Sequence, residues 1–218
     1  MKKRFCLGIV VLFFSVALYG HAEAPLPDAQ RFCKEYEIMN GQMNWDGSHA
    51  YQILELPEDN PIVYAKAEEL EALLSNGTSI LYLGFPECPW CRTLVPILFE
   101  AADVSTYSGN IYYYDALHDR DVLYLGDNDE VLTKKEGTNL YRMLVSKLEN
   151  YLGPYAGLND PTIKRIYFPT TVFIKGGDII DVHISTIEGQ NDAYEPLSNE
   201  QHSALLALFV ERMNTMNE

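Results

Sequence analysis

Two cysteines separated by two residues, Cys88-Pro89-Trp90-Cys91, form the motif with the clearest chemistry in this chain of 218 residues. An apolar run precedes the motif and a helical pattern follows it, so we expect Cys88 at a helix N-terminus and Cys91 one turn later, with their sulfurs close enough to form a disulfide. Unpaired backbone N–H groups and the positive end of the helix dipole favour the thiolate of Cys88. We therefore predict that Cys88 is a nucleophile and that Cys91 resolves the mixed disulfide which Cys88 forms.

Three other chemistries are compatible with this spacing. The pair could be a structural disulfide, although so short a loop gains little chain entropy. It could be half of a zinc site, but zinc needs four ligands and the sequence has no second CxxC motif and no HxxxH motif. Two thiolates could also hold Cu(I), so a copper carrier stays an alternative. The favoured interpretation needs neither a metal nor a cofactor.

The motif lies between a predicted strand and a predicted helix. Residues 79–84 form an apolar run, which Phe85-Pro86 ends immediately before the first cysteine. The helix is expected over residues 89–104. Pro89 suits its first turn, where a missing N–H costs nothing, whereas Pro96 in the middle should kink it.

Further elements follow from hydrophobic periodicity and turn residues. The spacing predicts a helix over 64–75, a strand over 111–115, two antiparallel strands over 170–175 and 179–185, and a last helix that begins after a capping box at Ser198. Together these elements form a predicted domain of alternating strands and helices.

Two segments fall outside this pattern. Residues 23–60 are predicted to be an N-terminal extension, with a short helix over 29–37 and one or two strands within 48–56. Residues 118–165 begin with a polar, turn-rich stretch and then resume a helical stripe, so we interpret them as a helical insert.

The chain resembles thioredoxin-fold proteins in three separate places. These are the strand at 79–84, the CxxC motif with Pro96 behind it, and residues 168–177, which read FPTTVFIKGG. The resemblance implies an α/β fold over residues 61–215, with a central mixed sheet flanked by helices, and it implies thiol-disulfide exchange as the activity. More narrowly, residues 84–92 are similar to exported proteins of Gram-positive bacteria related to bacteriocin transport accessory proteins.

The resemblance also assigns roles to individual residues. The peptide bond before Pro169 is expected to be cis and to face the CxxC motif. Phe168 and Thr170 are expected to line a groove where an extended substrate strand adds to the sheet. Trp90, which lies between the two cysteines, is expected either to offer an apolar contact surface at this groove or to tune the redox couple.

The chain departs from the thioredoxin pattern at Tyr82, where thioredoxin has a buried acid thought to serve proton transfer to the resolving cysteine. A phenol is a poor base at neutral pH. Proton transfer at Cys91 would then use water or a carboxylate such as Glu87, whose charge also opposes thiolate formation at Cys88. Arg92 is expected to compensate for that charge in part.

The residues between the cysteines indicate the direction of electron flow. Pro89-Trp90 lacks the histidine that stabilises the thiolate in strongly oxidising relatives, so we expect a more reducing couple and favour a reductase. Its partners would be protein disulfides and a redox protein that recycles the site. The alternative from another class is a non-catalytic secretion or folding accessory that binds extended peptides beside Pro169.

Charge and the N-terminus indicate where the protein works. The net charge is −15, which disfavours nucleic acid and anionic membranes as partners. Lys2, Lys3 and Arg4 precede an apolar run and small residues, so residues 1–22 are predicted to be a cleaved signal peptide that contains Cys6. We therefore expect an extracytoplasmic bacterial protein, secreted or associated with the cell envelope, that is not embedded in a membrane after cleavage.

Cys33 leaves an odd cysteine in the predicted mature chain, which invites a reactive role such as a third redox thiol. A buried free thiol on the helix at 29–37 is the favoured interpretation, because cysteine behaves as a small apolar residue.

Overall fold

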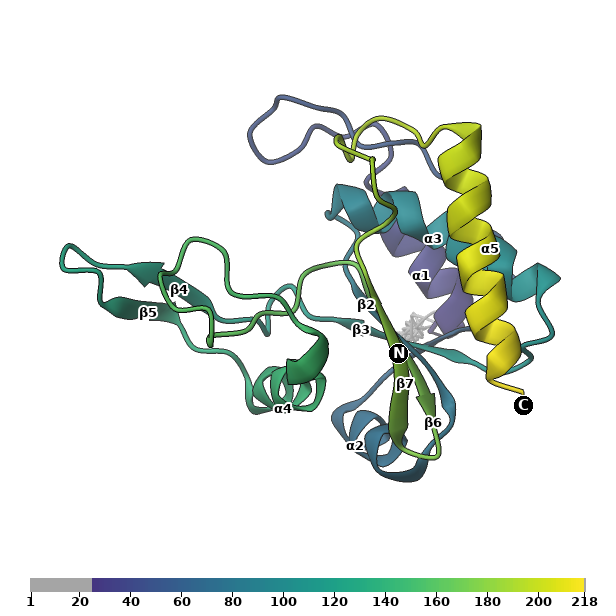
Figure 1. Ribbon diagram of the computed structural model, residues 1–218. Helices are drawn as coiled ribbons and strands as arrows, with labels where there is room; N and C mark the ends of the chain where they lie inside the picture. The colour runs from purple at the N-terminus through teal and green to yellow at the C-terminus, as the bar shows by residue number, and fades with distance from the viewer. Residues whose placement is uncertain (1–24, 218) are drawn as a thin grey trace, which may run out of the picture.

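A five-stranded mixed sheet forms the centre of the computed structural model, which describes residues 25–217 (Figure 1). The predicted signal peptide lies outside the described residues. The strand order is β1 (Ile62–Tyr64), β3 (Ile111–Asp115), β2 (Ser79–Gly84), β6 (Thr170–Lys175) and β7 (Asp178–Ile184). The first three strands are parallel to one another, whereas β6 and β7 run antiparallel to their neighbours.

Helices cover both faces of this sheet. One face packs against α1 (Asp28–Glu37), α3 (Pro89–Val104) and α5 (Asn199–Thr215), which lie together in Figure 1, and the other packs against α2 (Ala67–Asn76) and α4 (Asn139–Leu148). Successive side chains of β2 point to opposite faces of the sheet, so this strand contributes residues to both hydrophobic cores. Ile80 and Tyr82 point into the first, and Leu81 and Leu83 into the second.

The strand order and directions confirm the predicted α/β, thioredoxin-like fold class. Strands β2, β3 and β6 and helix α3 have the predicted boundaries. Strand β1 was missed, and Tyr64 ends this strand instead of beginning a helix. Three residues at a sheet edge are too few to show a periodicity, which explains the error.

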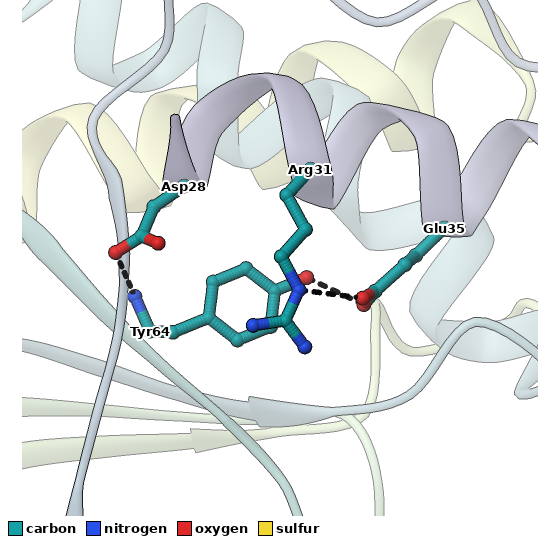
Figure 2. Close-up of polar contacts among 4 residues, drawn as sticks. All are labelled: Asp28, Arg31, Glu35 and Tyr64. Carbon is teal, nitrogen blue, oxygen red and sulfur yellow. Dashed lines mark hydrogen bonds and ion pairs between the residues drawn. The ribbon is translucent and has the colours of Figure 1, made fainter. Parts of the chain in front are cut away.

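The N-terminal extension is docked onto β1 by polar contacts that Figure 2 shows. The Tyr64 N–H donates to Asp28 Oδ2 at 2.9 Å, and the Tyr64 hydroxyl donates to Glu35. Arg31 bridges to Glu35 and lies over the Tyr64 ring, with 3.9 Å from Cζ to the ring centroid. Helix α1 is therefore an integral layer of the domain.

The strands predicted within residues 48–56 are wrong. Apart from a single bridge between Met43 and Ala50, this segment is irregular among the described residues. Its backbone is bonded by side chains instead. Asn40 donates from Nδ2 to the Leu54 carbonyl and accepts from the Leu54 N–H. These contacts satisfy groups that a neighbouring strand would otherwise have to pair.

The insert is only partly helical. Helix α4 and a following 3-10 turn over Glu149–Tyr151 agree with the prediction, but β4 (Val122–Leu125) and β5 (Val131–Lys135) form a hairpin that was not predicted. This hairpin projects away from the five-stranded sheet in Figure 1. Every residue of β5 is exposed, so the strand has no buried face to produce an alternating pattern.

No helix within residues 25–217 has the length and apolar character needed to cross a membrane.

Candidate active site

Cys88 occupies the N-cap of α3, directly after the loop that leaves β2. Its Sγ accepts the Cys91 N–H at 3.2 Å and lies 3.6 Å from the Phe168 carbonyl oxygen, to which the thiol donates. Pro89 fills the first turn as predicted, and the helix continues through Pro96. The Cys88 sulfur is therefore in the position that helix N–H groups stabilise as an anion.

The two cysteines differ in access. Cys88 is 5% exposed and Cys91 is 0% exposed, and both are free thiols. Burial, followed by the contact with Cys88, holds the pKa of Cys91 well above its usual value. Cys91 is therefore a protonated thiol at neutral pH, as the predicted resolving role requires until Cys88 is attached to a substrate.

The peptide bond between Phe168 and Pro169 is cis, as the resemblance implied. Phe168 is half-buried and its carbonyl oxygen accepts from Cys88, so this segment does lie against the CxxC motif. Trp90 is also half-buried and packs on the core below α3. Thr170 corrects the prediction. It is fully buried and its hydroxyl donates to the Tyr167 carbonyl at 2.6 Å, so its side chain does not line a substrate groove.

Tyr82 lies directly beneath the site. Its hydroxyl is 3.0 Å from that of Tyr36, a residue of α1 that the sequence did not connect with the motif. A methyl group on Gly84 would lie 2.4 Å from Tyr82 Oη and 3.2 Å from Cys91 Sγ, which shows how closely the phenol and the thiol approach this glycine. Burial, and then the neighbouring Cys91, raises the pKa of Tyr82 well above its ordinary value. Tyr82 is therefore no base at neutral pH, as predicted.

Arg92 does not play its predicted role. It is completely buried, and its guanidinium donates to the Tyr36 carbonyl at 2.6 Å, to Asn40 Oδ1 at 2.6 Å and to the Gln52 carbonyl at 2.5 Å. Burial lowers its pKa. The side chain thus joins α3 to the N-terminal extension, and its donors are not presented to Cys88. Glu87, by contrast, is exposed to solvent.

Another arginine approaches the site from the insert. Arg120 Cζ lies 5.5 Å from the ring centroid of Phe85 and 6.0 Å from that of Phe168. Sequence reasoning missed this residue, because nothing in the polar stretch around it indicates which part of the fold it contacts.

Cys33 is confirmed as a buried free thiol. Its Sγ donates to the Pro57 carbonyl and accepts from Asn60 Nδ2, both at 3.3 Å, and burial raises its pKa to about 11. In the part of the chain that the structure describes, no group of three or more His, Cys, Asp or Glu residues is arranged to hold a metal ion.

Comparison with known proteins gives only remote likenesses. No family model matches the chain, and no curated protein matches it. Among solved structures it is similar to oxidized thioredoxin O2 from Arabidopsis thaliana, with 19% identity, a TM-score of 0.33, and coverage of 57% of this chain and 83% of that one. It is also similar to a thioredoxin from Aeropyrum pernix, with 21% identity, a TM-score of 0.32, and coverage of 65% and 83%.

The sheet topology itself assigns the fold. The strand order and directions, with helices on both faces, are those of a thioredoxin-like fold, and the CxxC motif lies at the N-terminus of α3.

Proposed function

We propose that this protein is an exported thiol-disulfide oxidoreductase that exchanges a Cys88–Cys91 disulfide with protein substrates. The observation that carries the proposal is the asymmetry of the pair. Cys88 Sγ is slightly accessible at the N-cap of α3 and accepts the backbone N–H of Cys91, whose side chain is fully buried. The segment that contains cis-Pro169 lies beside this pair. An attacking thiol and a resolving thiol need this difference in access.

The proposed reaction is a two-step exchange. The Cys88 thiolate attacks one sulfur of a substrate disulfide, forms a mixed disulfide and releases the other substrate sulfur as a thiolate, which takes up a proton. Cys91 then loses its proton and attacks Cys88 Sγ, which releases the second substrate sulfur. Two electrons pass to the substrate, and the protein ends with a Cys88–Cys91 disulfide.

Proton removal from Cys91 is the demanding part of the second step, because its thiol is buried and its pKa is raised. The residue beneath Cys91 is Tyr82, a phenol, so this position supplies no carboxylate that could accept the proton. The departing substrate thiolate, which leaves at the same time and place, is the base that the proposal uses, with water as an alternative acceptor.

We favour the direction of substrate reduction. The support is the dipeptide Pro89-Trp90, which supplies no histidine to stabilise the Cys88 thiolate. Reducing and oxidising members of this fold differ by about 150 mV in reduction potential, so a measurement against glutathione and dithiothreitol buffers distinguishes the directions.

The exported location and the redox partner are part of the proposal. The support for export is the order of charged, apolar and small residues within residues 1–22. Recycling in the reducing direction requires an external dithiol donor, which the proposal takes to be a second redox protein.

Cysteine replacement tests the activity. Cys88→Ser should abolish reduction of a protein disulfide in the presence of dithiothreitol, and Cys91→Ser should accumulate a mixed disulfide that a non-reducing gel and mass spectrometry detect. Cys33→Ala is the matched control and should retain the activity. Full activity in Cys88→Ser would exclude the proposed chemistry. A Cys88–Cys91 disulfide that dithiothreitol cannot reduce would instead favour the non-catalytic accessory.

A further inference from the structure

The insert holds Arg120 at a defined place beside the candidate active site. Arg120 follows β3 in a turn, where its N–H donates to the Ala116 carbonyl at 3.1 Å. The neighbouring Asp119 carbonyl accepts the Thr138 N–H at 2.9 Å, which ties this turn to the start of α4. Two backbone hydrogen bonds therefore fix the turn that carries Arg120, one to the residue that follows β3 and one to the start of α4.

The two rings that Arg120 contacts also flank the reactive thiol. Phe85 and Phe168 form an edge-to-face pair with 5.4 Å between ring centroids and an interplanar angle of 69°. The Cys88 N–H donates to the Phe85 carbonyl at 3.2 Å, and the Cys88 thiol donates to the Phe168 carbonyl at 3.6 Å. Phe85 and Phe168 thus contact Arg120 through their rings and Cys88 through their carbonyl oxygens.

The guanidinium of Arg120 has aromatic contacts but no acidic partner. Among residues 25–217 it forms no ion pair and no side-chain hydrogen bond, whereas Arg31, Arg142 and Arg212 are each paired with a carboxylate. Asp121 is near enough for its pKa to be affected by Arg120, yet it forms no ion pair with it. The N–H donors of Arg120 are consequently available to a ligand.

A second cation reinforces the first. Arg165 lies over the Tyr155 ring, with 4.2 Å from Cζ to the centroid, and is also half-buried. Burial, and then repulsion by the charge of Arg165, lowers the pKa of Arg120. Within residues 25–217 neither arginine forms an ion pair, although burial raises the pKa of the neighbouring Asp121 and the charges of both arginines oppose that rise. A bound anion would relieve their repulsion.

We propose that Arg120, supported by Arg165, forms an anion subsite that selects protein disulfides flanked by an acidic residue. This inference rests on the proposed thiol-disulfide exchange and names its substrate class. A planar guanidinium held on aromatic rings can bind a carboxylate through two N–H groups, and it loses little side-chain entropy when it does so. The exposed carboxylate of Glu87, next to Cys88, repels an acidic residue and so orients the substrate toward Arg120.

Three peptide disulfides that differ at one position test the subsite. The residue next to the cystine is Glu, Gln or Lys, and the rate constant for exchange with the reduced protein is measured at low salt. The wild type should react about 10-fold faster with the Glu peptide than with the Lys peptide, which is a modest value for one charge-assisted contact at a half-exposed site. The preference should fall as salt is added, because screening weakens it.

Charge reversal at Arg120 gives the sharpest comparison. Arg120→Gln should remove the preference, and Arg120→Glu should reverse it in favour of the Lys peptide. In each variant the rates with the Glu and Lys peptides are expressed as ratios to the rate with the Gln peptide, because a change of charge near Cys88 can alter the reaction with all three peptides. Circular dichroism reports whether the variants are folded. The matched control is Arg142→Gln, which removes a cation of the same insert that is paired with Glu136, and it should keep the wild-type preference.

The outcomes separate the two proposals. If the wild type exchanges the Gln peptide but shows no charge preference, or if Arg120→Glu keeps the preference for Glu, the subsite is disproved and the redox function stands. If no peptide reacts with the wild type, the redox function and the subsite that rests on it both fail. Should Arg120→Gln and Arg120→Glu fail to fold, a wild-type preference that does not change with salt still disproves the subsite.

Discussion

Replacement of Arg92 by methionine tests how the N-terminal extension is attached to the active-site helix. Arg92 is fully buried in α3, and its guanidinium donates to three acceptors of the extension. It has no carboxylate partner among the described residues. Methionine retains most of the apolar stem and removes the buried guanidinium with its charge and its donors.

The expected cost follows from the partners that remain. In Arg92→Met the Tyr36 carbonyl keeps the Met39 N–H and Asn40 Oδ1 keeps the Leu54 N–H, but the Gln52 carbonyl keeps no donor. An orphaned carbonyl at this part-buried position costs about 1–3 kcal/mol, and the loss of a charge-assisted bond at the other two acceptors costs about 1 kcal/mol each. The methionine side chain avoids the desolvation of a cation, which offsets part of this sum. We expect a net loss of about 3 kcal/mol in the free energy of unfolding.

Urea unfolding at pH 7 under reducing conditions measures this loss. Arg142→Met, at an exposed arginine, is the control and should change the free energy of unfolding by less than about 0.5 kcal/mol. Asn40→Ala combined with Arg92→Met should reveal a coupling energy of about 1–2 kcal/mol, because both changes remove the same hydrogen bond. If Arg92→Met is as stable as the control, the guanidinium does not hold the extension in place and the reasoning fails.

Two further predictions concern buried groups around the site. Burial raises the pKa of Cys33 to about 11 from an ordinary 9.0, so the stability that its thiol contributes is complete below pH 9 and is lost as the pH rises toward 11. The difference in the free energy of unfolding between wild type and Cys33→Ala should therefore shift by about 2 kcal/mol in favour of the variant over this range. Denaturation curves of the two proteins that show no such shift would contradict this prediction. Gly84→Ala should cost about 1–3 kcal/mol in thermal unfolding, because its methyl group would lie 2.4 Å from Tyr82 Oη and 2.6 Å from Tyr82 Cζ. An unchanged melting temperature in Gly84→Ala would show that the ring moves aside freely.

The elements around the CxxC motif were predictable because their signals are local. Strand β2 is buried along its whole length and reads as a continuous apolar run, and Pro89 marks the first turn of α3. The cis bond before Pro169 followed from resemblance, since no physical property of the sequence distinguishes it from a trans bond. Where a segment has few buried side chains, as in β5, the pattern disappears and the strand was not found.

The contacts that specialise the site were not predictable, because they join segments far apart in the chain. Arg92 follows the motif directly, so sequence reasoning assigned it to Cys88. Its actual acceptors, at Tyr36, Asn40 and Gln52, belong to the extension. Arg120 is the opposite case, since it lies in a polar stretch and yet contacts the rings beside the thiol. Long-range packing, and not closeness in the sequence, therefore determines which arginine lies beside the candidate site.

The extension also gives a physical reason for the tyrosine at position 82. Phe32 and Tyr36 of α1 pack against Tyr82, which is 0% exposed, and the Tyr36 hydroxyl is the hydrogen-bond partner that the phenol needs. A carboxylate at this position would be ionised at neutral pH only at a high desolvation cost, because the position is fully buried among the rings of Phe32, Tyr36 and Tyr113. A helix that seals the space beneath Cys91 therefore favours a neutral hydroxyl pair over an acid. In the proposed reaction, the proton of Cys91 would therefore leave on the side of the site away from Tyr82, where the substrate thiolate would depart.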